Sequence, residues 1–303
     1  MRRRALAATT MAAALVLAGC SATGTGPAAE PPSTPAATST GATPTGTAVQ
    51  VDGTAWEHVH GLALDGQRLV VGTHQGLWGQ DPGQDPVQVS DTAFDVMGLA
   101  LDGDRWLASG HPAAGQDAPD DLGLQASTDA GVTWAPVSLQ GEVDFHRLVA
   151  AADTVMGMSA HDGKLLRSTD GGTTWDDLGT PALFDLAVDP AQPRTVVATT
   201  QKGPVRSADG GTTFTPIPDA PLVAFLAWTN RTLYGLAPDG TLQASTDGGT
   251  NWEARGNAGS RQPGALAADG DTVVALTGSV VTQSTDGGAT FAPRLNLIGA
   301  QGH

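Results

Sequence analysis

Six of the seven histidines lie between residues 58 and 161, among aspartates and one methionine. These candidates are His58, His60, His74, His111, His146 and His161, together with Asp95, Asp144 and Met97. Neutral imidazole is the commonest metal ligand in proteins, and imidazole with carboxylate suits zinc, copper, iron or nickel. A methionine sulfur beside them would favour copper over zinc. The same groups could instead do acid/base chemistry, and Asp95, Asp144 and His146 are then the catalytic candidates.

These residues do not have the short sequence spacings of a metal-binding motif, so the fold must bring them together. A repeated motif indicates which fold that is. Its form is Ser-x-Asp, one residue, Gly, one residue, Thr or Asn and then an aromatic, and its copies span 127–134, 168–175, 207–214, 245–252 and 284–291. Their aspartates follow one another at steps of 41, 39, 38 and 39 residues. A fixed period near forty predicts stacked or radially arranged copies of one unit.

Each copy of the motif lies where one expected strand ends and the next begins. Serine and aspartate side chains accept backbone N–H groups in tight turns, and glycine supplies positive φ. The motif resembles the Asp-box, or bacterial neuraminidase repeat, in which the box is structural. The resemblance therefore gives a structural role to five aspartates: Asp129, Asp170, Asp209, Asp247 and Asp286. The alternative is that these aspartates bind metal or sugar.

Three short strands precede each expected turn, and the closing aromatic starts a fourth. First strands are predicted near 59–64, 95–101, 145–150, 183–188, 222–228 and 264–268. Second strands are predicted at 68–73, 104–109, 154–159, 195–199, 231–236 and 271–276. Four strands per unit with radial repetition describe a β-propeller, so we predict an all-β fold of six four-stranded blades. Residues 52–56 could add an outer strand to the last blade and close the ring; seven blades is the alternative.

Aligning the six units shows where their symmetry is broken. Two residues before a shared leucine stand His60, Met97 and His146 in units one to three, and Phe184, Ala224 and Gly264 afterwards. Four residues before it stand His58, Asp95 and Asp144 in units one to three, and Ala182, Leu222 and Gln262 in units four to six. The loop after the second strand holds His74, His111 and His161 in units one to three alone. These side chains should converge on one rim, opposite the turns; the alternative is that each histidine is bonded separately in its loop.

From 52 to 295 the chain resembles exported bacterial proteins called sialidase-like or glycosylhydrolase-like. That resemblance implies a glycoside hydrolase acting on extracellular glycans. Sialidases of this architecture use an arginine triad, a tyrosine nucleophile with a glutamate partner, and an aspartate. Tyr234 is the only tyrosine, and it falls inside an expected second strand. The catalytic set is therefore not found, and a ligand-binding or assembly module is the first hypothesis, with glycoside hydrolysis as the alternative.

The N-terminal segment indicates export. Arg2, Arg3 and Arg4 precede an apolar run from Ala5 to Ala18, and Leu-Ala-Gly then leads to Cys20, the only cysteine. This looks like a bacterial lipobox, so we expect a signal peptide over 1–19 and a lipid on Cys20. The alternative is an ordinary secretory signal. Residues 20–50 are expected to form a tether rich in Ala, Thr, Ser, Pro and Gly, and 51–303 the propeller.

Charge restricts the partners. Without the three leader arginines, 12 basic residues face 31 acidic ones, a net charge of −19. A basic nucleic-acid footprint is absent, so no nucleic acid is expected as a partner. The expected partners are the outer face of the cell membrane, through the lipid, and a glycan, metal or protein ligand. A monomer is expected, and copper or zinc is the expected cofactor if a metal binds.

Overall fold

A computed structural model describes residues 48–52, 56, 58–90 and 94–298, and its regular elements there are all β-strands. Within those ranges no helix is long and apolar enough to cross a membrane. The leader at 1–19, Cys20 and nearly all of the predicted tether at 20–50 lie outside the described residues. The all-β prediction is confirmed for the described residues.

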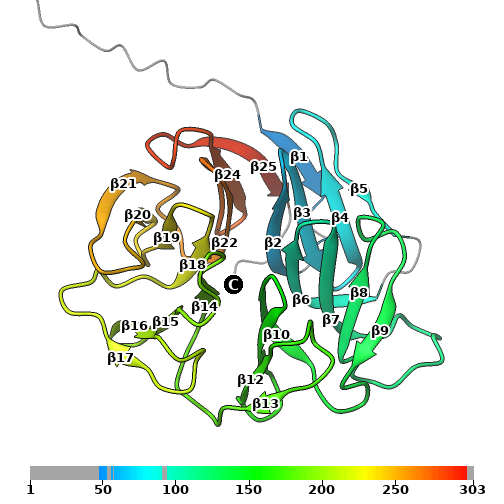
Figure 1. Ribbon diagram of the computed structural model, residues 1–303. Coiled ribbons are helices and arrows are strands. Elements are labelled where there is room, and N and C mark those ends of the chain that lie inside the picture. The colour runs from blue at the N-terminus through cyan, green and yellow to red at the C-terminus, as the bar shows by residue number, and fades with distance from the viewer. Residues whose placement is uncertain (1–47, 53–55, 57, 91–93, 299–303) are drawn as a thin grey trace, which may run out of the picture. The chain divides into compact units, whose positions relative to one another are not determined.

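Six sheets form the blades of a β-propeller (Figure 1), which confirms six rather than seven blades. Blade 1 contains β2 (Val59–Asp65), β3 (Arg68–Thr73), β4 (Gly76–Gln80) and β5 (Val87–Gln88). Blade 2 contains β6 (Asp95–Asp102), β7 (Arg105–His111), β8 (Leu124–Ser127) and β9 (Ala135–Ser138). Blade 3 contains β10 (Phe145–Ala151), β11 (Thr154–Ser159), β12 (Leu165–Ser168) and β13 (Asp176–Asp177).

The remaining three blades repeat the same antiparallel order. Blade 4 contains β14 (Leu186–Val188), β15 (Val196–Thr200), β16 (Gly203–Ser207) and β17 (Thr215–Pro216). Blade 5 contains β18 (Phe225–Trp228), β19 (Leu233–Leu236), β20 (Thr241–Ser245) and β21 (Glu253–Asn257). Blade 6 contains β22 (Pro263–Asp269), β23 (Thr272–Thr277), β24 (Val280–Ser284) and β25 (Ala292–Ile298), with β1 (Val49–Asp52) as a fifth strand. The first strands β2, β6, β10, β14, β18 and β22 contact one another in a closed ring.

The core lies between neighbouring blades, so the second strands are buried on both faces. In β3, Val70 packs with Trp106 of blade 2, whereas Val71 packs with Val274 of blade 6. Both valines are fully buried. Burial of one such side chain contributes about 1.5–3 kcal/mol. This two-sided packing explains why second strands read as apolar runs rather than as alternating patterns.

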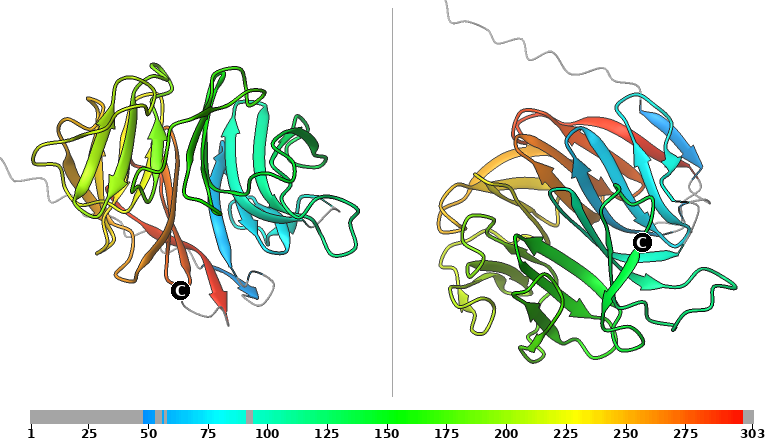
Figure 2. Two further views of the ribbon diagram at one scale, coloured as in Figure 1. Left: turned by 90° about the horizontal axis from the view of Figure 1, so that it is seen from below. Right: turned by 45° about the vertical axis from the view of Figure 1, so that its right-hand side comes forward.

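The ring is closed by the two ends of the described chain. Strand β1 pairs in parallel with β25, from Val49 with Leu295 to Asp52 with Ile298, and the two lie side by side in Figures 1 and 2. The closing strand therefore comes just before the 52–56 segment predicted for it. Trp56 instead is buried and packs on Trp78 of blade 1, with 5.8 Å between ring centroids. Seven outer strands thus serve six blades, because blade 6 has two.

Arg294 joins blade 6 to blade 1 at the same seam. Its Nε donates to Gln80 Oε1 at 2.6 Å, and its Nη2 donates to the carbonyls of Gln80 and Gln67 at 2.7 and 2.9 Å. Its Nη1 donates to Gln283 Oε1 at 3.0 Å. Burial lowers the pKa of Arg294 to about 10. Four acceptors around one buried guanidinium hold the first and last blades together.

The five motif copies form turns with one hydrogen-bond pattern, illustrated by the turn at Asp170. Asp170 Oδ1 accepts Ser168 Oγ–H at 2.7 Å and Thr174 N–H at 2.9 Å, and Oδ2 accepts Thr174 Oγ1–H at 2.6 Å. Ser168 Oγ accepts Gly172 N–H at 2.7 Å. The other four turns repeat these bonds, with Asn251 replacing threonine once. Both oxygens of each aspartate are therefore used within its own turn.

The turns also dock onto the preceding blade. Arg105 of blade 2 donates to the carbonyl of Gly171 at 2.6 Å, and Arg167 of blade 3 donates to the carbonyls of Asp209 and Gly210 at 3.1 and 3.0 Å. A Cβ at Gly172 would overlap the side chain of Leu124 in blade 2. The turns thus act as joints between blades.

Turns and histidines lie at opposite ends of the blades. In blade 3, Ser168 before the turn pairs with Val155 at the start of β11, whereas Phe145 pairs with Ser159 at its end. Asp144 and His161 flank that second end. The opposition predicted for the two sets is therefore seen in the strand register.

Candidate functional site

The first cluster of the rim joins blades 1 and 2. His60 is in β2, His74 follows β3 and Asp95 begins β6. His74 Nδ1 lies 2.7 Å from Asp95 Oδ2, and His60 Nε2 lies 3.3 Å from His74 Nδ1 and 3.7 Å from Asp95 Oδ1. One possible ligand atom from each residue lies within 4.8 Å of the other two. We call these three residues the His60 cluster.

His58 stands beside the His60 cluster. The centroid of its ring is 5.0 Å from that of His74 and 6.2 Å from that of His60. Burial lowers the pKa of His60 to about 3, and the imidazoles of His74 and His146 act in the same direction. His60 is therefore neutral at physiological pH, the form in which imidazole binds metals. Asp95 keeps one buried oxygen, Oδ1, without a hydrogen-bond partner among the described residues.

A second cluster lies on blades 2 and 3, around Asp144. Its carboxylate Oδ2 is 2.7 Å from His146 Nε2 and 3.5 Å from His111 Nε2. The side chain of Asp144 is 2% exposed, and Oδ1 has no hydrogen-bond partner in the described part of the chain. Because the charges of Asp144 and His146 act on the pKa of His60, the two clusters share one electrostatic environment.

Asp121, which the sequence analysis did not single out, completes the second cluster. It lies 3.0 Å from His161 Nε2 and 3.7 Å from His111 Nδ1, and hydrogen bonding to it raises the pKa of His161. His111 Nδ1 also lies 2.8 Å from the carbonyl of Asp120. The sequence offered one indication of this role, because Asp120 and Asp121 belong to the same loop of blade 2 as His111.

β-bulges in the first strands orient the rim residues. The register of β2, β6, β10 and β22 shifts at one equivalent position, occupied by His60, Met97, His146 and Gly264. A bulge places two residues opposite one and redirects a side chain. Of the histidines at these bulges, His60 belongs to the first cluster and His146 to the second. Met97 lines the central cavity with His60 and His146.

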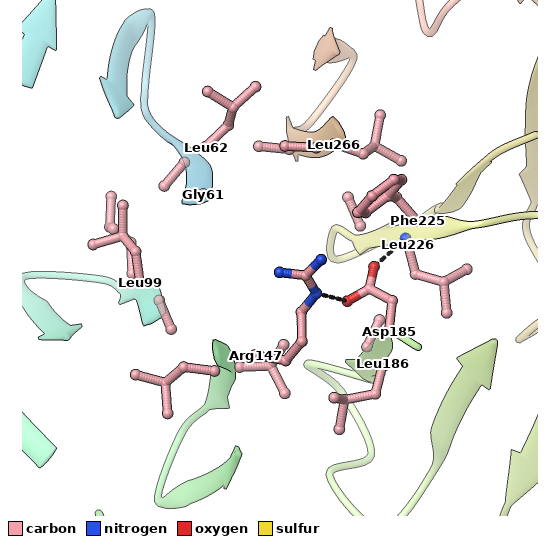
Figure 3. Close-up of a pocket in the computed structure, with 18 of the residues that line it drawn as sticks. Gly61, Leu62, Leu99, Arg147, Asp185, Leu186, Phe225, Leu226 and Leu266 are labelled. Atoms are coloured by element: carbon pink, nitrogen blue, oxygen red, sulfur yellow. Dashed lines mark hydrogen bonds and ion pairs between the residues drawn. The ribbon is translucent and has the colours of Figure 1, made fainter. Parts of the chain in front are cut away.

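That cavity, of about 220 Å³, runs along the centre of the ring between the six first strands. Its wall contains the six aligned leucines, Leu62, Leu99, Leu148, Leu186, Leu226 and Leu266. Figure 3 shows Arg147 and Asp185 facing each other at this cavity. Arg147 Nε lies 3.6 Å from Asp185 Oδ1, and Asp185 Oδ2 accepts the N–H of Leu226 at 2.8 Å. Burial raises the pKa of Asp185, and Arg147 opposes that rise.

Tyr234 does not have the surroundings expected of a sialidase nucleophile. It is 2% exposed in the core between blades 5 and 6, and burial raises its pKa. Its hydroxyl lies 3.4 Å from the carbonyl of Gly270, at the hairpin between β22 and β23. The tyrosine therefore takes no part in either rim cluster.

Neither a family model nor a curated protein matches this chain. Solved structures do match. A GH74 enzyme of Niastella koreensis has 19% identity over 78% of this chain and 45% of its own, with a TM-score of 0.56. The GH74 xyloglucanase of Xanthomonas campestris has 18% identity over 82% of this chain and 46% of its own, with a TM-score of 0.52. A chain of the nidogen/laminin complex has 10% identity over 75% and 93%, with a TM-score of 0.58.

These structures support a β-propeller. At such identities they show the fold alone, and this chain spans less than half the length of either GH74 enzyme. The propeller's function must therefore be argued from the rim and the cavity of this chain. The rim offers two groups of imidazoles near carboxylates, and the cavity offers the guanidinium of Arg147.

Proposed function

We propose that this protein is an exported lipoprotein whose propeller binds a transition-metal ion at the His60 cluster. One observation carries the metal: ligand atoms from His60, His74 and Asp95 lie within 4.8 Å of one another. Tetrahedral ligands at about 2.0–2.2 Å from a metal are roughly 3.3–3.6 Å apart. The two imidazole nitrogens are 3.3 Å apart, and the two oxygens of Asp95 lie 2.7 Å from His74 Nδ1 and 3.7 Å from His60 Nε2. Small side-chain movements would thus complete a site.

The chemistry of the donors supports zinc or copper. Two imidazole nitrogens and a carboxylate suit both ions, and copper(II) binds nitrogen and oxygen sites more tightly than zinc. His58 would supply a fourth ligand by turning its ring toward His74, 5.0 Å away. The buried Oδ1 of Asp95, which lacks a partner among described residues, would gain one on metal binding.

The N-terminal segment supplies the location in this proposal. A lipid on Cys20 would anchor the chain to the outer face of the bacterial cell membrane, with 20–50 as a tether. The acidic composition, net −16 for the whole sequence, would keep the propeller away from anionic lipid surfaces. The protein would then act as a monomeric binding module in metal handling, sensing or assembly at the cell envelope.

Elemental analysis tests the metal site. The purified protein is loaded with Zn²⁺ or Cu²⁺ and dialysed, and we expect about one ion per chain, as the single cluster requires. His74→Ala and Asp95→Asn should each lose the ion, with affinity falling at least about 100-fold, because a lost ligand costs more than a lost outer-shell partner.

His161→Ala is the matched control, because His161 is an exposed rim histidine paired to Asp121 outside the His60 cluster. It should keep the wild-type metal content. An ion-free wild type, or equal metal in His74→Ala and wild type, would contradict the proposal. Loss of metal in Asp144→Asn alone would move the site to the second cluster and contradict it as well.

Glycoside hydrolysis is the alternative function. It is motivated by Asp95 and Asp144, which each keep one buried carboxylate oxygen without a partner in the described residues. Two such carboxylates are what glycoside hydrolysis needs. A panel of chromogenic glycosides tests it: turnover that disappears in both Asp95→Asn and Asp144→Asn would favour the enzyme, whereas unchanged absorbance across the panel would count against it.

A further inference from the structure

The central cavity contains a cation that its surroundings satisfy only in part. Arg147 comes from β10, lines the cavity and is 32% exposed. Its Nη1 donates to the carbonyl of His146 at 3.0 Å. Within the described part of the chain, its Nε is buried without a hydrogen-bond partner and no hydrogen bond uses Nη2. A guanidinium has five N–H donors, so most of them are free to meet a ligand.

Two neighbouring blades hold this guanidinium in place. Asp185 of blade 4 faces Nε at 3.6 Å, and the Phe225 ring of blade 5 lies 5.5 Å from the guanidinium carbon. Figure 3 shows the outer edge of the guanidinium directed into the cavity, away from Asp185. Three blades thus fix the position of one cation, which lowers the entropy cost of using it for binding.

We propose that the central cavity binds a small monocarboxylate with an apolar body, and that Arg147 holds its carboxylate. The partly exposed side chains of Leu99 and Phe225 would contact the body, and the free edge of the guanidinium would donate two parallel hydrogen bonds to the two oxygens. The cavity of about 220 Å³ is smaller than the ~300–1,000 Å³ of pockets for drug-sized ligands, so the ligand is small.

Charge selects a monoanion. Asp185 already places one carboxylate beside Arg147, so the pair has little net charge to offer a dianion. A phosphate monoester would bring nearly two negative charges close to Asp185, and like charges at short distance repel each other. A neutral amide of the same shape would lack the charge-assisted bonds. The order expected is therefore carboxylate, then phosphate monoester and amide.

This inference does not require the metal. His60 and His146 line the cavity as well as the rim, so the two sites share a wall, but they use different ligand atoms. Variants of Arg147 should keep the metal content of the wild type. Failure of one proposal can thus be told from failure of the other by measuring both properties on the same preparations.

Calorimetric titration of the full protein with benzoate, benzamide and phenyl phosphate tests the proposal. We expect benzoate to bind at least about tenfold more tightly than the other two, as charge-assisted bidentate hydrogen bonds imply. Arg147→Gln should weaken benzoate binding by about tenfold or more. Arg231→Gln, which changes an exposed arginine on a loop of blade 5, is the matched control and should bind like the wild type.

Arg147→Gln leaves Asp185 buried without its partner and could unfold for that reason. The double variant Arg147→Gln/Asp185→Asn removes both charges and keeps the proposal testable. Weak benzoate binding by a folded double variant supports the role of Arg147. Wild-type affinity in that variant, equal affinity for benzamide and benzoate, or no binding of benzoate by the wild type would each overturn the proposal.

Discussion

At the end of the blades that carries the Ser-x-Asp turns, five blades present nearly identical side chains, whereas at the other end only blades 1 to 3 present histidine among the described residues. The hydrogen bonds differ in the same way. Each turn aspartate uses both oxygens within its own turn, but Asp95 and Asp144 each keep a buried oxygen without a partner in the described residues. Satisfied, repeated polar groups indicate joints, and unsatisfied, unrepeated ones indicate a binding site.

The largest effect on stability is expected for Gly172→Ala at the turn end. The new Cβ would meet Leu124 of blade 2, and Gly172 has φ +91°, so overlap and backbone strain add. We expect a loss of about 2–4 kcal/mol in the free energy of unfolding. Urea denaturation measures it.

Gly163→Ala is the matched control for that change. Gly163 has φ +69° but nothing within 4 Å of its new Cβ, so only strain of about 1–2 kcal/mol is expected. Equal losses in the two variants would show that the joint between blades contributes nothing beyond backbone conformation.

The second largest effect on stability is expected from acid, which should destabilise the Ser-x-Asp turns. Hydrogen bonds from Thr133 and Ser127 lower the pKa of Asp129 to about 2, and similar bonds to Asp170, Asp209 and Asp247 lower theirs. A carboxyl whose pKa is lower in the folded state stabilises the fold above its unfolded value near 3.9. That contribution is lost as pH falls from about 4 through about 2.

Thermal melts between pH 7 and pH 2.5 measure this acid dependence. The variant Asp170→Asn should lower Tm at pH 7 and reduce the further fall in Tm on acidification, because one of the titrating groups is gone. A slope identical to that of the wild type would show that the Asp170 turn does not contribute to acid sensitivity.

A change at the rim should affect stability less. Asp95→Asn in metal-free protein should alter the free energy of unfolding by less than about 1 kcal/mol, because His74 can still bond the amide and one unpartnered buried oxygen loses its charge. Urea denaturation in the presence of a chelator is the measurement. A loss above about 2 kcal/mol would show that Asp95 stabilises the fold as the turn aspartates do. The contrast between a structural end and a binding end of the blades would then disappear.

The smallest effect is expected where the first turn departs from the others. Ala130 has φ +58° at the place where the other four turns have glycine. Ala130→Gly removes strain of about 1–2 kcal/mol but adds unfolded-state entropy worth about 0.4–1 kcal/mol, so a gain of up to about 1 kcal/mol is expected. Ala191→Gly, in a loop without positive φ, should instead destabilise slightly.

Local patterns predicted most of the fold. The strands at 68–73 and 154–159 have the bounds expected for them, because apolar runs bounded by turn residues specify both ends. Strands β14 and β18 begin about three residues later than expected, at Leu186 and Phe225.

The candidate site was predicted in outline only. The period of the repeat places six histidines at one end, but it does not say which loops approach one another. The contacts of Asp121 with His161, and of Arg147 with Asp185, join different blades. Such pairs depend on the angle and spacing between blades, which no local pattern of residues contains. Their chemistry therefore required the three-dimensional structure.

The parallel pairing of β1 with β25 also orders the events of folding. Val49 and Leu295 stand next to each other in space but at opposite ends of the folded chain, so their contact closes a very long loop. Hairpins within blades close short loops and should form first, because loop-closure entropy grows with length. During synthesis, β1 must wait without its partner until residues 292–298 have been made. The propeller becomes a complete ring only when its last strand arrives.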